Sequence, residues 1–249
     1  MNRLQRPKVN GLPALIFWTL VWYLAALAMD NPLLLPGPVR VLRCLGNLIL
    51  TAAFWKTVAV TIGRILLGIL SAIALGCILA VLTSTSRLLE ILVAPAMTAM
   101  QATPVASFTI LVMIWLDRNY VPVLICGMMV LPVAWNSVST GIRTTDPQLL
   151  EMAKVYRLSR LQTLRRIWIP SVMPFFRTTC VNSIGLGWKA GIAAEVLTVP
   201  KHSIGRMIAD SKLYLMTEEL FASTLVVIAL SLLLQKCMLW LLNRRNGHA

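Results

Sequence analysis

The sequence predicts an all-α membrane protein with about six transmembrane helices. Only 13% of its 249 residues are charged, against about 25% in soluble domains, and 58% are apolar. Its mean hydropathy is +0.77. Largely uncharged runs recur along the chain, and a helix needs about 20 such residues to cross the hydrocarbon core. We therefore expect a single transmembrane domain over residues 1–249.

Six segments have the length and composition of spans. They are Gly11–Met29, Ile65–Ser86 with an extension back through Arg64 to about Phe54, Ile91–Leu116, Asn119–Ile142, Phe175–Leu197 and Leu220–Leu242. The third contains Pro95 and Pro104, and the fifth contains Arg177, Lys189 and Glu195. We therefore expect these two spans to be irregular.

Two features near the N-terminus leave alternatives open. The first span contains Ala26-Leu27-Ala28, which resembles a signal-peptide cleavage site, but its apolar part is long for a signal peptide. We expect an anchored helix. After the turn at Pro36-Gly37-Pro38, residues Val39 to Thr51 have apolar residues at helical spacing. They form either an amphipathic helix on the outer face or an extension of the second span.

An even number of spans places both termini on the same side of the membrane. The segments on that side, which include Arg143 to Pro170, hold more Lys and Arg than the segments on the other side. The positive-inside rule makes that side cytoplasmic. The basic stretch between the fourth and fifth spans is therefore expected in the cytoplasm.

Several other functional classes find little support. The net charge of +14 is spread between apolar runs and forms no single basic face, which argues against a nucleic-acid partner. Neither His202 nor His248 has partners at metal-ligand spacing, so we expect no metal site. The sequence has no GxxxxGK[ST] phosphate loop and no nucleophile–base set. Neither histidine lies in a predicted span, where an intramembrane protease would need one. We expect no catalytic residue.

The cytoplasmic stretch carries two helix starts. Asp146 followed by Pro147 is a favourable helix N-terminus, because aspartate caps the first N–H groups and proline fits the first helical position. Ser159 and Gln162 have the spacing of a capping box. We therefore expect a corner between the two helices at about Arg157 and Leu158. This shape suggests a docking partner, with an ordinary basic loop as the alternative.

The same stretch resembles the EAA motif of ABC-importer permeases, which places a coupling loop at residues 143–170. Four residues match at the spacing of the motif: Glu151, Ala153, Ile167 and Pro170. Met152 replaces an alanine of the motif, and Ile169 replaces a leucine. Arg157 replaces the corner glycine, where a left-handed backbone is easy only without a Cβ. The joint is therefore either less sharp or strained.

Other residues are similar to the nitrate, sulfonate, taurine and bicarbonate branch of these permeases. They are Thr61 and Arg64 followed by Gly68, Leu35 to Pro38, Pro104, and the stretch from Trp188 to Glu195. The resemblance covers nearly the whole chain. It implies a MetI-like, type I importer fold in the bacterial cytoplasmic (inner) membrane, with both termini cytoplasmic.

The resemblance also implies partners. Two copies, as a homodimer, would form the pore, and an extracytoplasmic binding protein would deliver the solute. ATP and Mg²⁺ would bind a separate ATPase dimer, so this chain would hold no cofactor. The solute would be a small anion such as nitrate, a sulfonate or taurine. The alternatives are a pyrimidine-type vitamin precursor and, with much less support, transport by a stand-alone secondary carrier.

The matched loop residues receive roles from the resemblance. Ala153 and its neighbours would pack into a groove of the ATPase, and Glu151 would set the pose of the helix. The alternative for Glu151 is a surface acid that the helix dipole favours.

Polar residues within the spans are candidates for the solute pathway. Lys189 and Glu195 share the fifth span with Gly187 and Gly191, whose spacing allows close helix approach. We expect this helix to line the pore or the dimer interface, with Lys189 attracting an anion. Both charges could also pair across helices or across the dimer. The structural alternative is that Lys189 snorkels or satisfies backbone carbonyls and that Glu195 reaches the outer interface.

The third span offers a second set of candidates. Gln101, Thr103 and Pro104 suggest a broken helix that lines a cavity, with core packing as the alternative.

Overall fold

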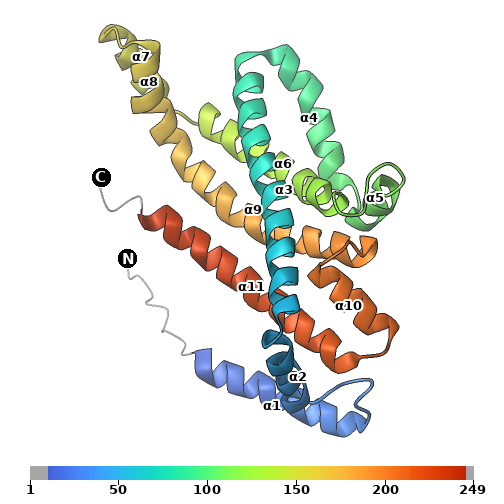
Figure 1. The fold of residues 1–249 in the computed structure, drawn as a ribbon. Coiled ribbons are helices and arrows are strands. Elements are labelled where there is room, and N and C mark those ends of the chain that lie inside the picture. Colours follow the sequence, from blue (N-terminus) through green and yellow to red (C-terminus); the bar gives the residue numbers. More distant parts are fainter. Residues whose placement is uncertain (1–10, 245–249) are drawn as a thin grey trace.

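The computed structural model describes residues 11–244, which form helices joined by short turns (Figure 1). The helices are α1 (Gly11–Met29), α2 (Pro38–Ile49), α3 (Ala52–Thr85), α4 (Arg87–Ala102), α5 (Val105–Val112), α6 (Val121–Arg143), α7 (Pro147–Val155), α8 (Arg160–Thr163), α9 (Ile169–Thr198), α10 (Ile204–Leu213) and α11 (Thr217–Arg244). A π-helix, η1 (Leu164–Trp168), joins α8 to α9. No strand occurs in this part of the chain.

The six predicted spans correspond to α1, α3, the pair α4–α5, α6, α9 and α11. By length and composition, α3, α6 and α11 can each cross a membrane, and the α4–α5 pair adds a fourth if it is one broken span. α4 and α5 meet at 104°, because Thr103 and Pro104 are extended. The predicted break in the third span is therefore confirmed.

α6 lies at the centre of the bundle and packs against both α3 and α9. Two glycines of α9 make the contact with these neighbours close. A Cβ on Gly187 would lie 2.6 Å from Cγ1 of Ile69, and a Cβ on Gly191 would lie 2.6 Å from Sγ of Cys126. The small residues of the fifth span thus serve packing within one chain, on the face of α9 that looks toward α3 and α6.

α2 settles the alternative left open for residues 39–51. It is a separate helix, because the chain is extended at Thr51 before α3 begins. Val41 is fully buried, whereas Arg40 and Arg43 are exposed, so the helix is amphipathic. α2 packs against α11 at the end of the bundle far from α7 and α8 (Figure 1). The alternative that residues 39–51 extend the second span is therefore wrong.

Candidate functional site

The knob formed by α7 and α8 lies at the end of α9 away from α10 (Figure 1). α7 begins as predicted: Oδ1 of Asp146 accepts the N–H of Gln148 at 2.8 Å, and Pro147 holds the first turn. α8 begins with the predicted capping box. The N–H of Ser159 donates to Oε1 of Gln162 at 2.8 Å, and the N–H of Gln162 donates to Oγ of Ser159 at 3.3 Å.

The corner between α7 and α8 is sharp and strained. Arg157 has φ of +50°, the left-handed conformation that favours glycine. The N–H of Leu158 donates to the carbonyl of Ala153 at 2.9 Å, and the N–H of Arg157 donates to that of Lys154 at 3.1 Å. This is the Schellman pattern of a helix end. Arginine thus keeps the corner that glycine would make, at a cost of about 1–2 kcal/mol.

The second helix of the knob does not end at Pro170. α8, η1 and α9 form one continuous rod, because the residues at both joints keep right-handed helical angles. Within η1 the N–H of Ile169 donates to the carbonyl of Leu164, five residues back. This wider turn stands just ahead of Pro170, which lacks an N–H and whose ring crowds the carbonyl four residues before it. The rod therefore continues through Pro170 without a break.

The motif residues divide between the inside and the surface of the knob. Ala153 and Ile167 are buried, with 5% and 4% of their surface exposed, whereas Glu151, Arg157 and Pro170 are exposed. The expected docking of Ala153 and its neighbours stays a prediction, but the Ala153 side chain itself has almost no free surface, so the neighbours would supply the contact. Exposed apolar residues of the α7 region are instead Leu149, Met152, Val155 and Tyr156.

A buried ion pair ties α3, α9 and α10 together at the other end of the molecule. Glu195 is fully buried, and its Oε1 accepts from Nη1 of Arg64 at 2.6 Å. Its Oε2 accepts from Oγ1 of Thr61 at 3.0 Å and from the N–H of Gly205 at 3.2 Å. Oγ1 of Thr61 also accepts the N–H of Ile204 at 3.0 Å. The Thr61 hydroxyl and the Glu195 carboxylate therefore satisfy the first two N–H groups of α10, those of Ile204 and Gly205.

This arrangement corrects the role expected of Glu195. A side chain with no exposed surface can line neither a solute pathway nor a dimer interface. Its partner lies on another helix of the same chain, so Glu195 holds the fold together.

Lys189 differs from Glu195 because it is exposed. Asn182, Ala193 and Leu197 are exposed with it, at a helical spacing that gives α9 one open face. Gly187 and Gly191 lie on the packed side of the helix. α9 therefore has one packed face and one open face, and Lys189 lies on the open one.

The candidates on the third span lie where its helix breaks. Gln101 and Pro104 are exposed, and Thr103 is half-buried. Oγ1 of Thr103 donates to the carbonyl of Ala99 at 2.7 Å, so its hydroxyl serves the end of α4. Pro104 caps α5. The structure places these residues at a bend that is open to the surface.

A family model described as the inner membrane component of binding-protein-dependent transport systems matches residues 72–245. The chain belongs to this family. It is an ABC transporter permease with a MetI-like fold. The crystal structure of an amino acid ABC transporter with histidines has a similar fold, with a TM-score of 0.57 at 15% identity over 76% of this chain and 90% of that one.

The permease also has relatives with named solutes. The taurine transport system permease protein TauC of Escherichia coli is 24% identical over 227 residues, 88% of this chain and 82% of TauC. The bicarbonate permease protein CmpB of Synechococcus elongatus is 24% identical over 190 residues, 76% and 68% of the two chains. The formylaminopyrimidine permease protein ThiX of Halalkalibacterium halodurans is 25% identical over 170 residues, 67% of each chain.

Sequence reasoning missed the partners of Glu195 and the helix that it caps. The signal was available, because Thr61, Arg64 and Gly68 share one helical face, and an arginine in an apolar span needs an acidic or carbonyl partner. Arg64 has both, since its Nη2 also donates to the carbonyl of Lys201 at 3.3 Å. In the permease, the Thr-x-x-Arg pattern is a structural clamp on α10.

Proposed function

We propose that two copies of the permease form the membrane pathway of an ATP-driven importer for a small anionic solute. A separate ATPase hydrolyses ATP and docks on α7, and an extracytoplasmic binding protein supplies the solute. α7 and both termini face the cytoplasm in this proposal, because basic residues are more frequent in the segments on that side.

The surface of α7 is the observation that carries the docking proposal. Val155 and Tyr156 are 79% and 72% exposed, and Leu149 and Met152 add apolar surface beside them. Such an apolar patch on a polar, basic loop is typical of a protein interface. The Asp146 cap and the left-handed corner at Arg157 fix both ends of the helix, which favours a defined partner.

The anionic solute is supported by Lys189. It is an exposed cation on the open face of α9, and charges within membrane spans usually serve a pathway. The names of the taurine and bicarbonate relatives agree with an anion. A pyrimidine precursor is the second candidate, because ThiX is named for such a solute.

Co-purification of the ATPase with permease variants tests the docking proposal. Val155→Asp should lower ATPase recovery at least about tenfold, the effect of roughly 1.4 kcal/mol, because it puts a charge into an apolar interface. The matched control is Leu161→Asp, an exposed apolar residue on α8, which should retain the ATPase. Recovery with Val155→Asp equal to that with the wild type would overturn the docking proposal.

Uptake measurements test the anionic solute in the same reconstituted importer. Lys189→Met should reduce uptake of taurine or bicarbonate while ATPase recovery stays unchanged. The control is Lys56→Met, which removes an exposed cation from α3. Unchanged anion uptake in Lys189→Met contradicts the role of Lys189, and uptake of a neutral pyrimidine alone favours the second candidate.

A further inference from the structure

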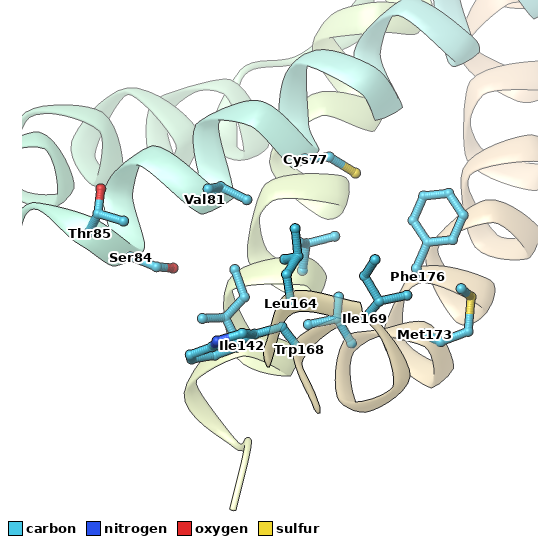
Figure 2. Close-up of a pocket in the computed structure, with 12 residues that line it drawn as sticks. Cys77, Val81, Ser84, Thr85, Ile142, Leu164, Trp168, Ile169, Met173 and Phe176 are labelled. Atoms are coloured by element: carbon cyan, nitrogen blue, oxygen red, sulfur yellow. The ribbon is translucent and has the colours of Figure 1, made fainter. Parts of the chain in front are cut away.

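A cavity of about 570 Å³ lies between α3, α6, η1 and the first turns of α9 (Figure 2). Its lining is almost entirely apolar and comes from Cys77, Val81, Ser84, Thr85, Val138, Ile142, Leu164, Trp168, Ile169, Val172, Met173 and Phe176. Its volume falls within the range of roughly 300–1,000 Å³ that is usual for ligand pockets. The α7 surface, the clamp at Glu195 and the open face of α9 contribute no residue to it.

The cavity has the polarity gradient of a lipid. Cys77, Met173 and Phe176 lie at one end, and Ser84 and Thr85, whose hydroxyls donate to carbonyls of α3 and can still accept, lie toward the other (Figure 2). The hydroxyl end coincides with the end of α3, where the chain leaves the apolar helix. An occupant that matches these walls has a long apolar part and a polar head at this end.

The depth of the cavity matches one leaflet of a bilayer. Cys77 and Thr85 are eight residues apart on α3, and Leu164 and Phe176 are twelve apart on the helical rod that faces it. At 1.5 Å per residue, the two walls are about 12 Å and about 18 Å deep. Half of the hydrocarbon core is about 15 Å. An acyl chain that enters from one leaflet therefore fills the cavity lengthwise.

The outer wall of the cavity continues into a lipid-type surface. Ile78, Val81 and Leu82 on α3 are exposed by 57%, 52% and 45%. A face of this kind on a membrane-spanning helix is suited to contact with acyl chains. The occupant is therefore expected to reach the cavity from the bilayer.

Two exposed arginines that neighbour lining residues in the sequence favour an anionic head group. Arg165 and Arg166 fall between the lining residues Leu164 and Trp168 in η1, although neither lines the cavity itself. None of the ion pairs described for residues 13–242 involves either arginine. Arg143, by contrast, is paired with Glu90.

We propose that this cavity binds one anionic phospholipid of the cytoplasmic leaflet, with its acyl chain between α3 and α9 and its head group at Arg165 and Arg166. The choice of leaflet rests on the proposed orientation of the permease. Basic pockets between transmembrane helices on the cytoplasmic side are suited to anionic head groups. The lipid chain then lies beside the π-helix that joins the knob to α9, and π-helices are frequent at functional sites.

Native mass spectrometry of the full-length permease, purified from membranes containing phosphatidylglycerol and phosphatidylcholine, tests this proposal without any transport measurement. The wild type should retain one phosphatidylglycerol per chain. Val81→Trp, which fills the cavity, should lower retention at least tenfold. Leu67→Trp, a similar change at an exposed position of the same helix away from the cavity, should leave retention unchanged.

The head-group contacts are tested by a surface variant that leaves the cavity walls intact. The double variant Arg165→Gln/Arg166→Gln should lower the preference for phosphatidylglycerol over phosphatidylcholine about 30-fold, or ~2 kcal/mol at ~1 kcal/mol for each arginine. Equal retention in Val81→Trp and the wild type overturns the proposal. So does a cavity that retains only detergent, is filled by a second copy of the chain, or shows no preference for the anionic lipid.

Discussion

Removal of the charge on Glu195 is the most demanding test of the clamp on α10. Glu195→Gln keeps the size of the side chain but leaves the guanidinium of Arg64, whose side chain is only 9% exposed, without a counter-charge. Loss of one partner from a buried ion pair costs about 3–5 kcal/mol. At about 2–4 °C per kcal/mol for a chain of this size, the melting temperature should fall by roughly 6–20 °C.

The assay is thermal unfolding of the full-length permease in detergent, followed by tryptophan fluorescence. Asp210→Asn is the matched control, because it breaks an ion pair with Arg206 that is 3.3 Å long and about half exposed, which contributes about 0–1 kcal/mol. The double variant Arg64→Met/Glu195→Gln should recover much of the loss, because it removes the unpaired charge. A melting temperature for Glu195→Gln within about 2 °C of the wild type would refute this account of the clamp.

Three further variants test other parts of the fold by the same assay. Arg157→Gly should raise the melting temperature by about 2–4 °C, because glycine relieves the left-handed strain by ~1 kcal/mol; a fall would contradict the strained corner. Gly187→Val should destabilise the permease by roughly 1–3 kcal/mol, because the new Cβ would meet Ile69. The control Ala193→Val, on the open face of α9, should leave stability unchanged, and equal effects of the two variants would contradict the close contact. Asp146→Ala should lower the free energy of unfolding by about 1 kcal/mol, and Asp146→Asn should lower it much less, because asparagine can also cap the helix. Equal losses in the two variants would contradict the cap.

The knob shows which structural features could be predicted from neighbouring residues in the sequence. Asp146 and Ser159 cap backbone groups within three residues of themselves, so both helix starts could be predicted from sequence alone. The strain at Arg157 could be predicted only as one of two outcomes. The conformation of a corner depends both on the backbone preference of its residues and on the helices that it joins. Here the corner is sharp, because Arg157 adopts the left-handed conformation.

The burial of the motif residues, by contrast, could not be predicted from neighbouring residues. The spacing from Glu151 to Pro170 gave no indication that Ala153 and Ile167 are buried within the chain. Burial depends on how α7 and the rod of η1 and α9 lie against each other. That arrangement follows from tertiary packing, and it moved the candidate docking surface from Ala153 to Val155 and Tyr156.

The sequence by itself determined the membrane class, the position of the long apolar helices, the break before Pro104 and the caps of the knob, because hydropathy, proline and capping act over a few neighbouring residues. Only the tertiary structure decided what each intramembrane charge does. Lys189 and Glu195 are six residues apart on one helix, yet one is exposed and the other is paired with Arg64, 131 positions away. A contact between residues so distant in sequence is fixed by how whole helices pack, and no local pattern contains that information.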